Sequence, residues 1–150
     1  MDEAFVIRSN VKLSTKGSHV ILHAAEKEAA RMGVPQCIAV VDEGGHLLAF
    51  SRMDGARIGS IQIAITKAVS AATRKRRTEE EGRGDPQTIL RLSLAARPQS
   101  LTGLKGGIPI QIDDEVIGAI GVASGTGDED VQVAEAGLAA FFSQAAGARN

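Results

Sequence analysis

The sequence predicts an α+β domain in which helices pack on an antiparallel β-sheet. Two pairs of strand-like segments are each joined by a short turn, and each pair is followed by a helical segment. Such hairpins place consecutive strands side by side, whereas a doubly wound α/β fold alternates single strands with helices. At 150 residues the chain has the usual size of one domain, so we expect residues 1–150 to form a single domain.

The first helical segment begins at Ser14 or Thr15, either of which can cap a helix N-terminus, and it extends to Met32. Gly33 and Pro35 then end the helix. One face of this helix is predicted to pack on the sheet. Its residues, at helical spacing, are Ser18, Ile21, Leu22, Ala25, Ala29 and Met32.

Both predicted hairpins have turns of three residues. The first joins residues 37–42 to residues 46–52 through Glu43-Gly44-Gly45, whose glycines can adopt the positive φ angles of a tight turn. The second joins residues 108–113 to residues 116–124 through two aspartates and a glutamate. Together the two hairpins supply four strands to the predicted sheet.

Three further helical segments follow the hairpins. The second helix begins after Asp54-Gly55, and its predicted sheet-facing side consists of Ile58, Ile61, Ile65, Ala68, Val69 and Ala72. It ends in a stretch where Lys75–Arg77 would pair with Glu79–Glu81 at i+4 if the helix continues, which favours a solvated helix end over a phosphate-binding patch. A short helix over residues 86–96 and a final helix over residues 128–146 complete the pattern.

The composition excludes several classes of partner. The formal net charge is -1, and the chain has no Trp or Tyr, so neither phosphate contacts nor base stacking favour a nucleic-acid partner. No apolar run is long enough to span a membrane. The acidic N-terminus does not have the pattern of a secretory signal, and the single cysteine, Cys37, cannot form an internal disulfide. These features predict a cytoplasmic protein.

His19 and His23 are four residues apart, so they lie on one side of the first helix at the edge of its apolar face. This spacing can serve a metal, or one imidazole can ligate haem iron. The alternative is a pair of ordinary surface histidines. Because the sequence has no HExxH motif and no cysteine–histidine cluster, we do not expect a zinc site.

Arg52, Asp54 and Lys67 are the candidate catalytic residues of an alternative enzyme hypothesis. Arg52 ends a strand and Asp54 opens the next helix, so their side chains could converge at the rim of the sheet on an acidic or carbonyl substrate. The alternative is that they pair with each other and that Asp54 caps the helix. Lys67 points away from the isoleucine face of its helix, so we expect it to be solvated or directed at another subunit.

Three other features have simpler structural interpretations. Residues 124–127 precede the final helix and could hold an anion, but the acidic residues 128–130 in the first turn favour a capping loop. Asp42 fits the first turn, and Cys37 fits a buried strand position as a small apolar residue.

Four segments, in order along nearly the whole chain, resemble the signature blocks of the GlcG/HbpS-like haem-binding family, which is related to the C-terminal domain of PduO-type cobalamin adenosyltransferases. The segments are AVVDEGGHLLAFSRMDGA, ITKAVSAA, GGIPIQIDDEVIGAIGVAS and EDVQVAEAGLAA. Where the family often shows GVSGG in the last strand, this chain has Ala123 and Ser124 in place of the serine and the following glycine.

The resemblance implies a profilin-like α/β/α sandwich with a five-stranded antiparallel sheet, and self-association into a dimer or larger ring. It also implies a small-molecule binding protein, with haem as the ligand, acting as a sensor or carrier. His19 and His23 occupy the region in which a histidine of one PduO-type relative ligates haem. The exposed small and apolar residues expected on the second helix, Ile63, Ala64 and Ala71, also favour self-association. A catabolic or biosynthetic enzyme and a purely structural subunit are the alternatives.

Overall fold

The structure, a computed structural model, describes residues 5–6 and 11–147 and forms five helices and four strands within them. In chain order the elements are α1 (Thr15–Met32), β1 (Cys37–Asp42), β2 (Leu47–Arg52), α2 (Ser60–Arg74), α3 (Thr78–Glu81), α4 (Pro86–Ala95), β3 (Gly107–Ile112), β4 (Glu115–Ala123) and α5 (Gly127–Gly147). The single-domain prediction and the interpretation of the acidic N-terminus fall partly on residues outside the described ranges, and both stay predictions.

The sheet has the strand order β2-β1-β4-β3, and every neighbouring pair is antiparallel. Both predicted hairpins are therefore confirmed. The expected fifth strand is wrong, because the described residues form four strands. Between α2 and β3 the chain contains Pro86 and Pro98, which cannot donate to a strand ladder, and that stretch forms short helices and loops instead.

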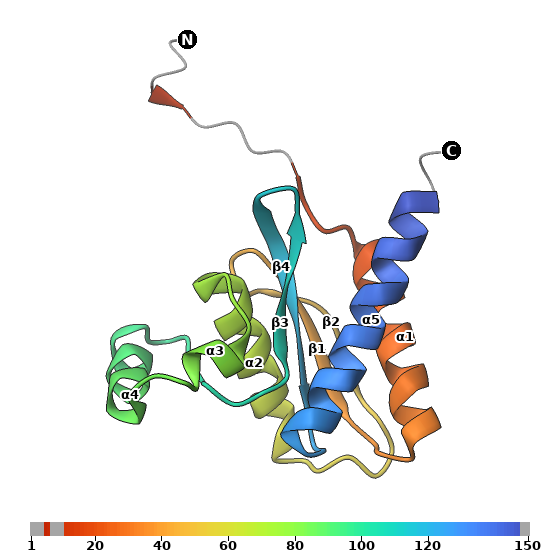
Figure 1. Cartoon of the computed structure of the whole chain (residues 1–150), viewed down its shortest axis with the longest axis horizontal. Helices are drawn as coiled ribbons and strands as arrows, with labels where there is room; N and C mark the ends of the chain where they lie inside the picture. The colour runs from red at the N-terminus through yellow and green to blue at the C-terminus, as the bar shows by residue number, and fades with distance from the viewer. Residues whose placement is uncertain (1–4, 7–10, 148–150) are drawn as a thin grey trace.

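Helices cover both faces of the sheet. α1 and α5 lie side by side on one face and α2 lies on the other (Figure 1). Successive side chains of β1 point to opposite faces of the sheet, as the two-residue period of a strand requires. Ile38 and Val40 belong to the core beneath α1 and α5. Cys37, Ala39 and Val41 belong to the core beneath α2.

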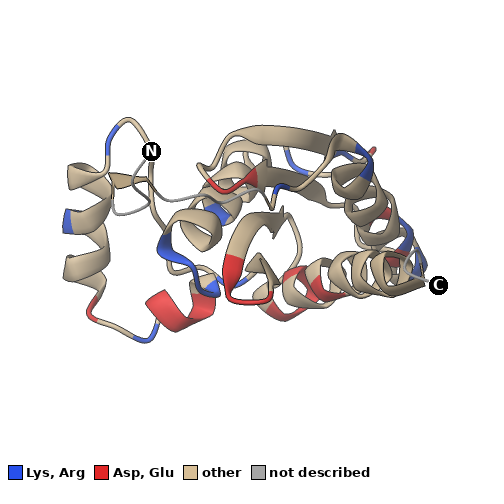
Figure 2. Cartoon of the chain, turned by 90° about the horizontal axis from the view of Figure 1, so that it is seen from above, with Lys and Arg blue, Asp and Glu red and all other residues tan. Residues whose placement is uncertain are grey.

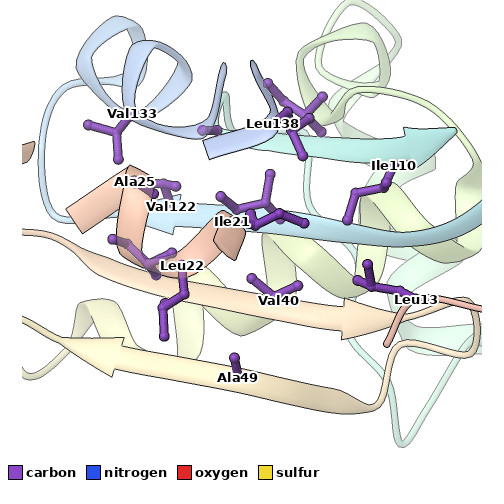
Figure 3. Packing of buried hydrophobic residues seen from close by; sticks show 14 of the residues in the cluster. Leu13, Ile21, Leu22, Ala25, Val40, Ala49, Ile110, Val122, Val133 and Leu138 are labelled. Atoms are coloured by element: carbon purple, nitrogen blue, oxygen red, sulfur yellow. The ribbon is translucent and has the colours of Figure 1, made fainter. Parts of the chain in front are cut away.

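The core beneath α1 and α5 consists mainly of branched aliphatic side chains (Figure 3). The predicted face of α1 is confirmed, with Met32 partly buried and the other five residues fully buried. The predicted helix limits are confirmed as well. The Ser14 hydroxyl accepts a hydrogen bond from the Gly17 N–H at 3.0 Å, and Gly33 ends the helix at a φ of 70°.

The core beneath α2 consists mainly of alanine, so this helix lies very close to the sheet. A Cβ added to Gly121 of β4 would lie 2.1 Å from the Ala64 carbonyl oxygen, which shows how near the two backbones are. The predicted sheet-facing side of α2 is confirmed except at Ile58, which precedes the helix and is 74% exposed. The buried side also contains Ala64, Lys67 and Ala71, which the prediction left out. Because Ala64 and Ala71 are buried here, they cannot supply the exposed surface for self-association that we expected from them.

The charged stretch after α2 is neutralised, but by a fold-back rather than by a continuous helix. α2 ends at Arg74, and Lys75 takes a left-handed conformation. Arg74 and Arg76 then both donate to Glu81 of α3, from Nε to Oε1 at 2.7 and 2.9 Å. The Arg76 and Arg74 guanidinium groups lower the pKa of Glu81. These contacts agree with a charge-paired segment and not with a free phosphate-binding patch.

α4 stands apart from the sheet, at the far end of the molecule from α1 and α5 (Figure 2). None of its residues is buried. Leu90 and Leu94 are 54% and 50% exposed, which leaves an apolar stripe at i,i+4 spacing without a partner in the described chain.

No helix in the described ranges is both long and apolar enough to cross a membrane, although α5 has 21 residues. The charges of its first turn and the small residues along its length distinguish it from a membrane span.

Candidate functional site

The two histidines of α1 form an exposed pair. The rings of His19 and His23 have centroids 5.9 Å apart and meet edge to face, so the predicted shared side of the helix is confirmed. Within the described chain, neither ring forms a hydrogen bond or ion pair with another residue. Their nitrogens are therefore available to an external ligand.

The surroundings of this histidine pair are partly apolar and partly cationic. A hollow of about 320 Å³ lies between α1 and α5, with Val20 and Phe141 among its lining residues. Gly17 permits this approach, because a Cβ there would lie 3.1 Å from the Phe141 ring. Lys16 and Lys27 lie three residues before His19 and four residues after His23, so all four side chains share one side of the helix.

Arg52 and Asp54 do not come together. Both side chains are exposed, and the described chain contains no ion pair between them. Asp54 does not cap α2, because the helix begins at Ser60 after Gly59, with no side-chain cap. The turn between them and the helix, in which Gly55 has a φ of 90°, places Asp54 away from the helix end. The alternative, in which the two residues pair and Asp54 caps the helix, is therefore wrong, and their convergence on a substrate stays a prediction.

Lys67 is 3% exposed, so the expectation that it is solvated or directed at another subunit is wrong. Its Nζ donates to the Val122 carbonyl oxygen and to Asp130 Oδ2, both at 2.7 Å. Asp130 Oδ1 accepts from the Gly125 N–H at 3.0 Å. Burial raises the pKa of the Asp130 carboxyl, while the ammonium of Lys67 opposes that rise. The result is a buried ion pair that joins α2, β4 and α5.

α2 and α5 begin at the same end of the sheet (Figure 1). The buried pair borders a pocket of about 410 Å³ there, whose lining includes Ser60 and Gly127, the first residues of the two helices. Arg57, Ile63 and Leu104 also line it. Ser124, at the end of β4, has a φ of 105°, in the region that favours glycine. Its hydroxyl accepts from the Arg57 N–H at 3.0 Å and so fixes the loop that carries Arg57.

The loop over residues 124–127 caps α5, as predicted. Thr126 and Glu129 form a reciprocal capping box, in which each side chain accepts from the other residue's backbone N–H. Cys37 is fully buried, and burial raises the pKa of its thiol, so its predicted role as a small core residue is confirmed. Asp42 also has its predicted turn role, because its Oδ1 accepts from the Gly44 and His46 N–H groups.

The sequence interpretation did not single out Arg57. It named Ser124 only as part of the loop before the final helix and as a departure from the family pattern, and it treated Asp130 only as a first-turn acid. One signal for the ion pair was present, since Lys67 lies among alanines at the spacing of the face that packs on the sheet. Ser124 also had a signal, because it occupies a position at which the family pattern has glycine. The contact between Lys67 and Asp130 joins residues 63 positions apart, which no local pattern predicts.

Comparison with known proteins identifies the family to which this chain belongs. Residues 13–139 match the family model described as "Haem degrading protein HbpS-like". The chain belongs to the HbpS-like family. It is 38% identical over 117 residues to Protein GlcG of Escherichia coli (strain K12), an alignment that covers 78% of this chain and 85% of GlcG.

Solved structures that are similar to this chain have the same fold. Klebsiella pneumoniae protein ORFY superposes with a TM-score of 0.81 at 31% identity, covering 91% of this chain and 96% of ORFY. The PduOC:Heme complex superposes with a TM-score of 0.79 at 28% identity, covering 87% of this chain and 95% of PduOC. The predicted family resemblance, including the relation to PduO proteins, is confirmed.

Proposed function

We propose that this chain is a haem-binding protein that holds the iron through His19 or His23 on the outward side of α1. The observation that carries this proposal is the pair of exposed imidazoles with unused ring nitrogens. A neutral imidazole is a common axial ligand of haem iron. The structural similarity to a haem complex supports haem as the ligand.

The residues around the histidine pair fit an amphiphilic planar group. Val20 and Phe141 offer an apolar surface beside the imidazoles. Lys16 and Lys27 are exposed and form no ion pair within the described chain, so the lysine on the propionate side of the ring can hold a propionate. When bound, haem would supply an iron centre with a changeable oxidation state, which suits a sensor or a carrier.

Haem at this face would be more fully enclosed by a second copy of the chain. The two histidines are exposed, and the neighbouring hollow holds only about 320 Å³. The apolar stripe of Leu90 and Leu94 on α4 is a second surface that association could cover. We therefore expect light scattering at micromolar concentration to give the mass of a dimer or larger assembly. A single species near 15.6 kDa would contradict self-association.

A hemin titration tests the proposed iron ligand. We expect the Soret band of added hemin to shift with the parent protein. Replacing one of the two histidines, by His19→Ala or His23→Ala, should weaken binding at least about tenfold, and the double variant should lose the shifted band. Because both side chains are exposed, melting temperatures should stay unchanged.

His46→Ala is the matched control, because this third histidine is exposed in the turn between β1 and β2. It should bind hemin as the parent does. A double His19→Ala/His23→Ala variant with the parent's affinity and spectrum would refute the histidine assignment.

A further inference from the structure

The pocket at the beginning of α2 and α5 contains one cation without a counter-charge. Two of its lysines are neutralised, since Lys67 pairs with Asp130 and the Lys105 Nζ lies 2.8 Å from Asp128 Oδ1. Arg57 forms no ion pair within the described chain. Its backbone N–H is held by Ser124 at the end of β4, which fixes the loop from which the guanidinium extends.

A buried donor in the same pocket also lacks an acceptor. The ammonium of Lys67 has three N–H groups, and two of them are used by Val122 and Asp130. For the third, the described residues provide no acceptor. Buried N–H donors are rarely left unsatisfied, so an acceptor atom that enters the pocket would complete this site. The first turn of α2, with Ser60 in the pocket wall and no side-chain cap, adds positive potential.

The remaining wall of the pocket is apolar. Ile63 and Leu104 line it and are 40% and 57% exposed, which is unusual for large aliphatic residues next to a charged site. The volume of about 410 Å³ lies in the range of small-molecule sites. A single excess cation matches one negative charge, whereas a phosphate dianion would bring a second negative charge toward the carboxylate of Asp130, which lines the pocket.

We propose that this pocket binds a monocarboxylate with a short apolar chain. Arg57 and the third N–H of Lys67 hold the carboxylate, and Ile63 and Leu104 contact the carbon chain. The carboxylate belongs either to a free small acid or to the propionate arm of a larger amphiphile. This site lies on different elements from the histidine pair of α1. The carboxylate proposal therefore does not depend on whether the histidines ligate haem.

Butyrate and its uncharged analogue butyramide are suitable probes, followed by backbone amide chemical shifts in NMR spectra of the whole chain. Butyrate should shift the amides of Ile63, Leu104 and Ser124, and butyramide at the same concentration should not. Arg57→Ala should weaken butyrate binding at least about tenfold without changing the fold, because the residue is exposed. Arg91→Ala is the matched control, an exposed arginine on α4 away from the pocket.

Added hemin distinguishes the two sources of carboxylate. If hemin displaces butyrate, and Arg57→Ala weakens hemin as well as butyrate, the carboxylate is a propionate arm. If hemin and butyrate bind together, the ligand is a free acid. The proposal is overturned if butyrate shifts no pocket amide, if butyramide binds equally well, or if Arg57→Ala binds butyrate as tightly as Arg91→Ala does.

Discussion

Replacing Lys67 by methionine is expected to lower the free energy of unfolding by about 3–5 kcal/mol. The substitution retains most of the volume of the side chain but leaves Asp130, 3% exposed, without its cation. An uncompensated carboxylate in a dry site is strongly unfavourable, because the lost attraction had offset its desolvation. Chemical denaturation of parent and variant at pH 7 measures the difference.

The stability lost in the Lys67→Met variant should depend on pH. The pKa of Asp130 determines whether acidification increases or decreases that loss. Burial already raises this pKa above its ordinary value of 3.8, and removal of Lys67 raises it further. A carboxyl with a raised folded-state pKa destabilises the fold above that pKa, and the penalty disappears as pH falls toward 3.8. The Lys67→Met variant should therefore regain stability on acidification, relative to a Lys67→Met/Asp130→Asn variant that has no carboxyl at this position.

Lys105→Met is the matched control for the buried pair. Lys105 pairs with Asp128, but their side chains are 50% and 87% exposed. Solvent screens such a pair, so its loss should change the stability far less than the loss of the buried pair does. Equal losses of stability in Lys67→Met and Lys105→Met would show that the Lys67–Asp130 pair is not shielded from water.

Gly121→Ala should lower the free energy of unfolding by about 3 kcal/mol or more, at the upper end of the range for overpacked cores. The new methyl group would lie 2.1 Å from the Ala64 carbonyl oxygen and 2.5 Å from the Ala68 nitrogen. Both neighbours are helix backbone, so α2 as a whole must move away from β4. That movement would also open the alanine core between them, because close-packed interiors do not absorb such a shift locally.

Gly59→Ala provides the comparison for Gly121→Ala. A Cβ at Gly59 would meet nothing within 4 Å, and the residue already has the right-handed φ and ψ that alanine prefers. Its replacement should leave the stability unchanged or raise it by up to about 1 kcal/mol. Thermal and urea denaturation of the two variants compare them directly. A Gly121→Ala variant as stable as the parent would mean that α2 is not held against β4 at this distance.

Local patterns predicted most of the fold. The cap at Ser14, the stop at Gly33 and the glycine turn after Asp42 each depend on neighbouring residues, and all three are present. For α2 the predicted sheet-facing side was incomplete, because it left out Ala64, Lys67 and Ala71. Glycines in β3 and β4 bring the helix so close to the sheet that these residues are buried as well.

The histidine pair could be predicted from the sequence, whereas the pocket could not. The histidine pair follows from i,i+4 spacing within one helix, so its geometry was accessible from the sequence. The pocket depends on contacts between distant segments. Lys67 meets Asp130 across 63 positions, and the hydrogen bond from the Arg57 N–H to Ser124 crosses 67 positions. Such contacts follow from the topology of the sheet. The helical periodicity of α2 could place Lys67 on the side that packs on the sheet, but it could not identify Asp130 as its partner.

The proposed role of α1 is tested most directly by locating the iron. In a crystal of the hemin complex, anomalous scattering at the iron absorption edge marks the metal independently of the protein model. We expect the iron peak within bonding distance of an imidazole nitrogen of His19 or His23, on the outward side of the helix. An iron peak in the pocket lined by Arg57 and Lys67, or anywhere else away from α1, would contradict it.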